Sequence, residues 1–369
     1  MLVGQDEQGT IIDLSQLTKK AIADLKARKW YCCHCKTELV VKNGNFKLSH
    51  FAHRSTALCD AFTDNESEEH LKGKKLIAVN CQKFGTAYQL EAYLPSLKQR
   101  PDILLRAKLA IEWQCSRLSV ERMHERTTNY IENEYIPIWL LGHKLMTSKK
   151  TIRLTQLQRK FVDFSASWGC FLLGLDLEKK QLIRHHHIVF YEGKLSFAED
   201  IRRLSSLPLE KLLIEDSQQV ASTTCMSPKE KESYFLRQSY QWNQRLTRKE
   251  PTIMALQQFF YPHQINLRQP PKWLLVPRLT HCLFEEKELV IRYKILACLS
   301  HLAQATTQEL TAYLMADNWL INELAQYPLI RSEEMLTPVV ENYLQALIQY
   351  GYRKIYYTGR YWKYQRQKV

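Results

Sequence analysis

The hydrophobic pattern changes period several times between residues 61 and 145, which indicates alternating helices and strands. Apolar side chains recur at helical spacing in NESEEHLKGKKLIAVNCQKF, and acidic residues occupy its first turn, as the helix dipole favours. Apolar and polar residues then alternate in TAYQLEAYL, as in a half-buried strand. The pattern predicts the order helix, three strands, helix, strand, at residues 65–84, 86–94, 100–105, 109–116, 118–134 and 135–142.

This order predicts a mixed sheet with flanking helices. The short connections allow the first three strands to form an antiparallel meander. The helix at 118–134 can serve as the crossover that brings the last strand, YIPIWLLG, into the same sheet.

The chain divides into four parts by composition and pattern. Residues 1–60 are short, turn-rich and rich in Cys and His; residues 61–145 carry the predicted sheet. Residues 151–280 are of uncertain fold, and residues 285–369 contain helices followed by a hairpin. We therefore expect an α+β/α/β multidomain protein with a zinc-ribbon-like N-terminal segment and a helical C-terminal region.

The last part contains the pieces of a winged helix. A capping box of Thr306 and Glu309 opens its second helix, and Thr337 with Pro338 is expected to open its third. An insertion at 315–336 departs from a minimal winged helix. The predicted helices and hairpin are at 288–302, 306–314, 337–352 and 353–368.

The C-terminal hairpin is strongly basic. From Arg353 to Lys368 it has six basic residues and no acidic one, with Tyr and Trp between them. That mixture suits phosphate contact and base stacking. The residues expected to bind DNA here are Arg353, Lys354, Arg360 and Lys363. The alternative is a helical protein-interaction domain with a basic tail.

The overall charge agrees with a nucleic-acid partner. Lys and Arg number 52 against 38 Asp and Glu, a net charge of +14, which favours a polyanion, although an inert basic surface is the alternative. We find no apolar run long enough to span a bilayer and no signal-peptide pattern at the N-terminus. We therefore expect a cytoplasmic protein without membrane insertion, in which cysteines serve as thiols or metal ligands.

The N-terminal part carries a predicted zinc site. Cys32-x2-Cys35 has the spacing of a zinc knuckle, and His50-x2-His53 follows a plausible hairpin with Asn-Gly at its tip. We expect a structural Cys2His2 site for Zn²⁺, with Cys33, His34 and Cys59 near enough to substitute. The alternative is a small metal-free domain whose histidines contact the backbone or DNA.

Two carboxylates stand inside apolar strands of the predicted sheet. Asp102 opens one strand and Glu112 lies within the next, so the two can converge on one point. Buried carboxylates are unfavourable unless they are paired or bind a cation. Oxygen ligands of this kind suit Mg²⁺ or Mn²⁺, which can activate water against a phosphodiester.

These residues carry a family resemblance. Arg-Pro-Asp102 followed by Glu112-x-Gln114 resembles the PD-(D/E)xK nuclease signature, whose fold is restriction-endonuclease-like. With ESEEHLKGK, HFAH and Arg126-x-x-x-Tyr130, the set resembles more closely the competence protein CoiA family of naturally transformable bacteria. The resemblance covers roughly residues 30–142.

The resemblance implies residue roles by position. Asp102 and Glu112 correspond to the metal-binding pair, and Gln114 stands where the general motif has Lys. Lys there can carry positive charge towards the scissile phosphate, whereas the Gln amide can only orient water. A helix carboxylate completes the metal site in related nucleases, which favours Glu66, with His70 as a neighbour able to relay a proton.

Three further residues are expected near the nucleic acid. Arg126 and Tyr130, one turn apart on the second helix, are suited to a phosphate and a base or sugar, the alternative being an ordinary exposed helix. Arg100 is expected near the same site, or as a strand cap.

The resemblance implies a role in natural transformation, in which a metal-dependent nuclease acts on incoming or recombining DNA, single-stranded or branched, alongside the recombinase machinery. Gln114 keeps a second hypothesis open, a non-catalytic DNA-binding recombination factor with a nuclease-like fold. A third is an RNA-processing nuclease.

Overall fold

The computed structural model describes residues 1–44, 47–54, 59, 67–116, 118–147, 153–191, 194–214, 228–276 and 283–365. The chain forms two compact units. The first comprises Met1–Thr147, Leu172–His185 and Glu199–Asp216, and the second comprises Ser148–Phe171, His186–Ala198 and Ser217–Val369. The Cys/His-rich segment and the predicted sheet therefore belong to the same unit.

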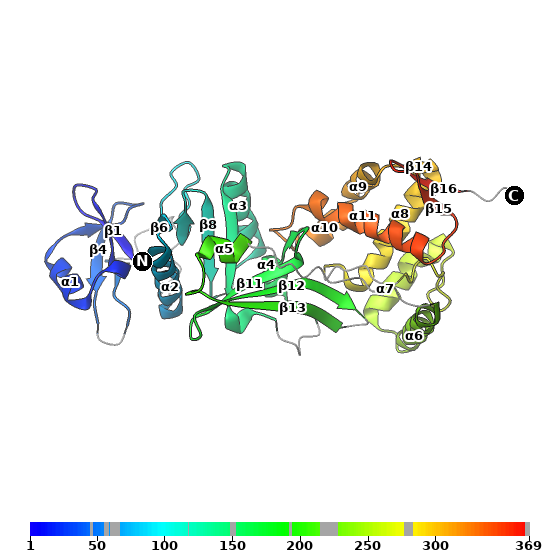
Figure 1. Ribbon diagram of the computed structural model, residues 1–369, viewed down its shortest axis with the longest axis horizontal. Helices are drawn as coiled ribbons and strands as arrows, with labels where there is room; N and C mark the ends of the chain where they lie inside the picture. Colours follow the sequence, from blue (N-terminus) through cyan, green and yellow to red (C-terminus); the bar gives the residue numbers. More distant parts are fainter. Residues whose placement is uncertain are drawn as a thin grey trace. The chain divides into compact units, whose positions relative to one another are not determined.

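A small antiparallel sheet forms the N-terminal part of the first unit (blue in Figure 1). Helix α1 (Lys19–Asp24) begins after Thr18, whose side chain accepts a hydrogen bond from the Ala21 N–H. Ile22, Trp30 and Phe51 are buried in the hydrophobic core of this N-terminal part. The strand order is β2-β1-β3-β4-β5, with bounds β1 Val3–Gln5, β2 Ile11–Asp13, β3 Trp30–Tyr31, β4 Glu38–Lys42 and β5 His50–His53.

The central sheet confirms the predicted order of helix, three strands, helix and strand. Strands β6, β7 and β8 form an antiparallel meander, and β9 joins β8 in parallel after the crossover helix. The bounds are α2 Glu68–Phe84, β6 Tyr88–Leu90, β7 Ile103–Leu105, β8 Leu109–Gln114, α3 Val120–Glu132 and β9 Ile136–Gly142.

Strands from the region of uncertain fold extend this sheet. Strand β11 pairs with β9 in parallel and with β12 antiparallel. Within the described residues the order is β13-β12-β11-β9-β8-β7-β6, with β10 paired to β11. The added strands are β10 Asp163–Ser165, β11 Gly169–Asp176, β12 Gln181–Tyr191 and β13 Lys194–Arg203.

Helices α2 and α3 cover opposite faces of β8, as Figure 1 shows. On the α2 face, the Trp113 ring packs on Gly73, where an added Cβ would lie 2.3 Å from the indole nitrogen. On the α3 face, Trp139 is the β9 neighbour of Glu112, and its indole N–H donates to Thr127 Oγ1. Successive residues of β8 thus point to different helices.

The second unit contains a separate helical core. Trp242, Phe260 and Leu274 are buried in it. Among the described residues, no helix combines the length and the apolar character that crossing a membrane requires. The remaining α-helices before the C-terminal region are α4 Gln156–Phe161, α5 Leu209–Ile214 (which belongs to the first unit), α6 Pro228–Thr247 and α7 Pro251–Phe260.

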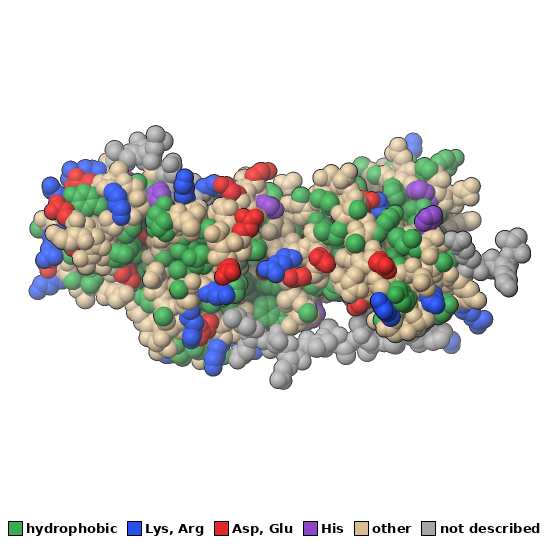
Figure 2. Space-filling view, turned by 90° about the horizontal axis from the view of Figure 1, so that it is seen from above, with side chains coloured by type: hydrophobic (Ala, Val, Ile, Leu, Met, Phe, Trp, Pro, Cys, Tyr) green, Lys and Arg blue, Asp and Glu red, His purple; other side chains and the backbone are tan. Residues whose placement is uncertain are grey.

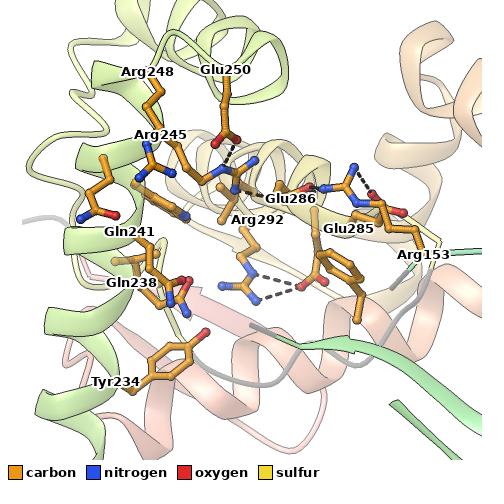
Figure 3. Close-up of a pocket in the computed structure, with 16 residues that line it drawn as sticks. Arg153, Tyr234, Gln238, Gln241, Arg245, Arg248, Glu250, Glu285, Glu286 and Arg292 are labelled. Atoms are coloured by element: carbon orange, nitrogen blue, oxygen red, sulfur yellow. Dashed lines mark hydrogen bonds and ion pairs between the residues drawn. The ribbon is translucent and has the colours of Figure 1, made fainter. Parts of the chain in front are cut away.

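A cavity of about 440 Å³ in the second unit is lined by paired charges (Figure 3). Arg245 donates to Glu250 over 2.6 Å and also contacts Glu286 at 3.1 Å. Arg292 contacts Glu288 at 2.9 Å. Because glutamates in the same cavity neutralise these arginines, its lining does not form a basic site for phosphate.

The C-terminal region combines helices with a three-stranded sheet of order β14-β16-β15. The capping box of Thr306 and Glu309 is present at the start of its second helix. The predicted start of the last helix at Thr337 is wrong: α11 begins at Ser332, and Pro338 lies inside it. The bounds are α8 Glu288–Leu302, β14 Gln304–Ala305, α9 Thr307–Met315, α10 Asn318–Leu324, α11 Ser332–Gln349, β15 Ile355–Tyr357 and β16 Trp362–Tyr364.

Candidate nuclease-like site and metal centre

Asp102 directly precedes β7, and Glu112 lies within β8. The antiparallel register pairs Ile103 with Ile111, so the two acidic residues stand next to this pair on neighbouring strands. Neighbouring strands lie about 4.8 Å apart. The fold therefore places the two acidic residues on neighbouring strands, with the Asp102 side chain in contact with α2 and the Glu112 side chain in contact with α3.

Helix α2 surrounds the Asp102 carboxylate with donors. His70 Nε2 lies 2.9 Å from Oδ2, the Trp113 backbone N–H donates to the same oxygen over 2.8 Å, and Lys74 Nζ lies 3.6 Å from Oδ1. Burial opposes ionisation, but the charges of His70 and Lys74 and these hydrogen bonds hold the pKa of Asp102 well below its usual range. These contacts thus favour the ionised form of Asp102.

Helix α3 surrounds the Glu112 carboxylate, whose side chain is 4% exposed. The Arg126 guanidinium and the Tyr130 hydroxyl, which is 2.6 Å away, both donate to Oε1. Burial raises the pKa of Glu112 to about 7, against the opposing charge of Arg126. The pKa values of the two carboxyl groups are therefore shifted in opposite directions, that of Asp102 downward and that of Glu112 upward.

The donor set partly fits a hard divalent cation. Both donors to Glu112 use Oε1, so Oε2 accepts no hydrogen bond among the described residues, and Asp102 Oδ1 meets only Lys74 at 3.6 Å. Mg²⁺ and Mn²⁺ prefer such oxygens. The described ranges do not bring a third acidic or His ligand atom within 4.8 Å of both carboxylates. The candidate third ligand, Glu66, lies outside the described residues.

A buried lysine–glutamate pair borders Asp102, and the sequence pattern did not reveal its glutamate. Lys74 is fully buried, and its Nζ lies 2.5 Å from Glu91 Oε1. The same carboxylate accepts the backbone N–H groups of Leu2 and Val3 at 2.9 and 3.2 Å. Glu91 therefore connects strand β1 to the helix that carries His70 and Lys74.

Gln114 and Arg100 have local partners. Gln114 donates through Nε2 to Ser116 O and Oγ at 3.0 and 3.1 Å. Arg100 reaches the Met1 sulfur through Nη1 at 3.0 Å, and its own carbonyl accepts from Arg126. Neither side chain donates a hydrogen bond to the two carboxylates among the described residues.

The expectation that Arg126 and Tyr130 contact DNA does not fit their burial. Arg126 is 8% exposed and Tyr130 is 0% exposed. Both side chains donate hydrogen bonds to Glu112, because they lie on the buried face of α3, which packs against the sheet. We therefore assign them to positioning and neutralising Glu112.

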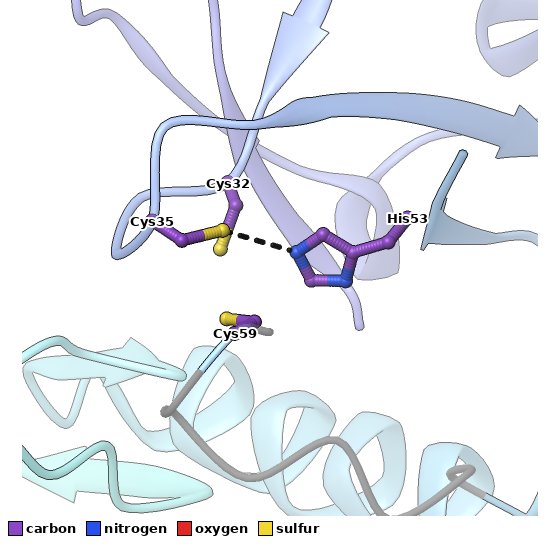
Figure 4. A group of neighbouring side chains, drawn as sticks. All are labelled: Cys32, Cys35, His53 and Cys59. Carbon is purple, nitrogen blue, oxygen red and sulfur yellow. Dashed lines mark hydrogen bonds between the residues drawn. The ribbon is translucent and has the colours of Figure 1, made fainter. Parts of the chain in front are cut away.

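A second cluster, Cys32, Cys35, His53 and Cys59, places four ligand atoms within 4.8 Å of one another (Figure 4). Cys35 Sγ lies 3.3 Å from His53 Nε2. Burial opposes ionisation of Cys35, but hydrogen bonds from Thr37, Cys59 and Cys32 lower the pKa of its thiol. The cluster could bind a metal such as zinc, whose structural sites use tetrahedral Cys3His sets.

His50 is not part of this cluster, and Cys59 takes the fourth place. His50 and His53 both belong to β5, where residues three apart point to opposite faces. The His50 ring contacts the Leu48 carbonyl instead, with Nδ1 2.9 Å from the oxygen. The expected Cys2His2 set is therefore replaced by Cys3His.

The basic residues predicted to bind DNA at the C-terminus lie on the second unit. Arg353 and Arg360 are exposed, whereas Lys354 and Lys363 are half-buried. On the face drawn in Figure 2, Lys and Arg side chains are scattered among acidic ones.

Comparisons with known proteins agree on one family. The family profile described as "Competence protein CoiA, nuclease-like domain" matches residues 66–217, and "Competence protein CoiA, N-terminal domain" matches residues 14–62. The chain is similar to "Competence protein CoiA" of Bacillus subtilis (strain 168), with 32% identity over 173 residues. That alignment spans 45% of this chain and 46% of the relative, less than half of its length. No solved structure gives a significant match.

Proposed function

Because the chain belongs to the competence protein CoiA family, we propose that it is a metal-dependent nuclease that processes incoming or recombining DNA in natural transformation. The observation that carries this proposal is that Asp102 and Glu112 stand on neighbouring strands, each carboxylate with a cation from a helix beside it. A cytoplasmic location and work alongside the recombinase belong to the same proposal.

Asp102 and Glu112 would hold Mg²⁺ or Mn²⁺ through the oxygens that lack a donor. The ion would supply Lewis-acid activation of the phosphodiester and a more acidic bound water. His70, at 2.9 Å from Asp102, fixes the orientation of that carboxylate and can relay a proton. Arg126 and Tyr130 hold Glu112 in one rotamer, so both ligands are preorganised.

Lys74, which is buried and paired with Glu91, would place a positive charge beside Asp102 that Gln114 does not provide. Its ammonium lies 3.6 Å from Asp102 Oδ1, on the α2 side of the same carboxylate. In the general motif the lysine follows two residues after the glutamate, whereas here the cation comes from the neighbouring helix. The departure at Gln114 is thus compatible with cleavage.

The test is a cleavage assay with single-stranded, double-stranded and branched DNA in Mg²⁺ or Mn²⁺. We expect Asp102→Asn and Glu112→Gln to lower the rate by more than the roughly 10- to 100-fold that loss of an outer-shell partner of a metal ligand costs. Glu125→Gln, a surface carboxylate on α3 paired with Arg122, is the control expected to cut normally. Cleavage undiminished in both site variants would overturn the assignment, and RNA as competitor would separate an RNA nuclease.

A second candidate is a DNA-binding factor that does not cut. It is favoured by the occupation of Glu112 by Arg126, which neutralises a charge that a metal would otherwise use. DNA affinity without cleavage, in every metal and substrate combination, would support it.

The C-terminal region is proposed as a winged-helix-like DNA-binding domain. Its helices α8, α9 and α11 and its sheet order β14-β16-β15 support this proposal, and Arg353, Lys354, Arg360 and Lys363 stand on or beside the hairpin. The alternative is that this region is a protein-interaction domain, and a DNA-binding measurement distinguishes the two.

A further inference from the structure

The β14–β16–β15 sheet has one buried and one outer face. Ala305, Trp362 and Ile355 are 1, 2 and 3% exposed and belong to the inner face. On the outer face, Lys363 of the middle strand β16 lies opposite Tyr356 of β15 on one side and opposite Gln304 of β14 on the other. Residues directly opposite in an antiparallel pair share a face, so these three side chains form one row.

The outer face offers an aromatic ring between cations. Tyr356 is 46% exposed, and Lys354 lies two residues earlier, in the turn that leads into β15. Among the described residues, neither Lys354 nor Lys363 forms an ion pair. The neighbouring Tyr357 is different, because its ring stacks on buried Trp362 with a centroid distance of 4.5 Å. Tyr357 is also exposed, at 49%, so its ring contact with Trp362 is what distinguishes it from Tyr356, whose ring has no such contact among the described residues.

The last helix of this region is unsuited to DNA phosphates. In helix-turn-helix arrangements the recognition helix enters the major groove between two phosphate backbones. The charged residues of α11 are Glu333, Glu334 and Glu341, and the helix contains no Lys or Arg. Like charges therefore disfavour groove insertion by α11, which leaves the sheet as the basic surface of this region.

We propose that the outer face of the β14–β16–β15 sheet binds single-stranded nucleic acid, with one base stacked on Tyr356 and the flanking phosphates on Lys354 and Lys363. This inference rests on the proposed function only in taking a nucleic acid as the ligand. Stacking on an exposed ring requires an unpaired base, since the bases of a duplex are already stacked. A single strand is therefore the class of ligand that the row accommodates, in preference to duplex DNA.

The test measures binding of a fluorescent oligothymidylate to the full chain by anisotropy, with divalent metal removed by EDTA. Tyr356→Ala should weaken affinity roughly 5- to 100-fold, as loss of one stacked base does. Tyr356→Phe keeps the ring and should bind within about twofold of the parent. Tyr313→Ala, 47% exposed on α9, is a matched control for exposure and should bind like the parent.

The lysine contacts are tested through salt dependence. Lys363→Gln should weaken binding and reduce the slope of log affinity against log salt by about 0.7, the value for one phosphate contact on a single strand. Affinity unchanged in Tyr356→Ala, an equal loss in Tyr313→Ala, or tighter binding of a duplex would each overturn the proposal. A loss that Tyr356→Phe shares would also overturn it, because stacking would not be the cause.

The same variants separate this inference from the nuclease proposal. Binding is measured without metal and repeated with Asp102→Asn, so a chain that never cuts DNA can still confirm the stacking row. Conversely, the Tyr356→Ala variant should cut saturating DNA at the parental rate, because its nuclease site is intact. Its loss of affinity is measured separately, in the binding assay without metal.

Discussion

Lys74 and Glu91 form an ion pair with almost no solvent access, the ammonium being 0% and the carboxylate 2% exposed at a distance of 2.5 Å. Each charge depends on the other, because neither can be solvated by water where it lies. The pair also borders Asp102, so the electrostatics of the candidate nuclease site depend on it.

Removing one member of this pair should lower the stability of the folded chain. Lys74→Met leaves the Glu91 charge buried, and we expect a loss of about 3–5 kcal/mol in the free energy of unfolding, measured in urea. The double variant Lys74→Met/Glu91→Gln should be less destabilised than Lys74→Met alone. Lys72→Met is the matched control, because Lys72 pairs with Glu68 on the exposed face of α2 and should change stability by under about 1 kcal/mol. Equal losses at both lysines would contradict the buried-pair account.

Gly73 is expected to be intolerant of a side chain. An added Cβ would lie 2.3 Å from Trp113 Nε1, and Trp113 is 1% exposed and has no room to withdraw. Although Ala is the better helix former, Gly73→Ala should destabilise by about 1–3 kcal/mol, the usual range for overpacking. Gly44→Ala, with nothing within 4 Å of the added Cβ, should be near neutral in the same thermal-unfolding measurement. A neutral Gly73→Ala would show that α2 is not in contact with Trp113.

The Cys3His cluster predicts which residues control metal content. Protein purified without chelator should carry about one zinc per chain. Cys59→Ser should lose that metal, because Cys59 is one of the four ligand positions. His50→Ala and Cys33→Ser should keep it. Metal analysis by mass spectrometry decides between the ligand sets: loss in His50→Ala with retention in Cys59→Ser would restore the Cys2His2 arrangement.

Asp163 should make stability pH-dependent. Burial raises the pKa of Asp163 from 3.8 to about 7, despite the hydrogen bond that Oδ1 accepts from the Phe164 N–H. Between these two values the folded chain holds a proton that the unfolded chain has released, so this contribution to stability falls as the pH rises from about 4 to about 7 and is level above. Asp163→Asn removes the titration. We expect the stability of the variant relative to the parent to increase across that interval in urea denaturation, whereas a constant difference would refute the shift.

The sequence predicted the parts of the fold in which local pattern and global structure agree. The order from α2 to β9 followed from hydrophobic period, since each element is amphipathic or bounded by turns. The start of α11 did not, because Pro338 resembles a first-turn proline although the helix begins at Ser332. Here Thr337 donates to the Glu333 carbonyl from inside the helix instead of capping it.

The site was predictable where sequence neighbours become spatial neighbours. A short turn joins the strands at Asp102 and Glu112, so strand pairing places the two residues on neighbouring strands. Glu91 and Cys59 owe their places to long-range packing, which spacing alone does not encode. His50 was misplaced because the Cys-x2-Cys and His-x2-His spacings look alike, whereas one lies in a turn and the other in a strand.

The carboxylate of Glu91 also bears on how far the two family segments can be dissected. It joins the first residues of the chain, which precede the matched range 14–62, to the range 66–217, accepting the amides of Leu2 and Val3 while holding Lys74. A fragment that starts at residue 66 would therefore leave this carboxylate without its backbone donors and open the lysine beside Asp102 to water. The nuclease-like segment is not an autonomous module in this respect, because its chemistry is inherited partly from residues far upstream.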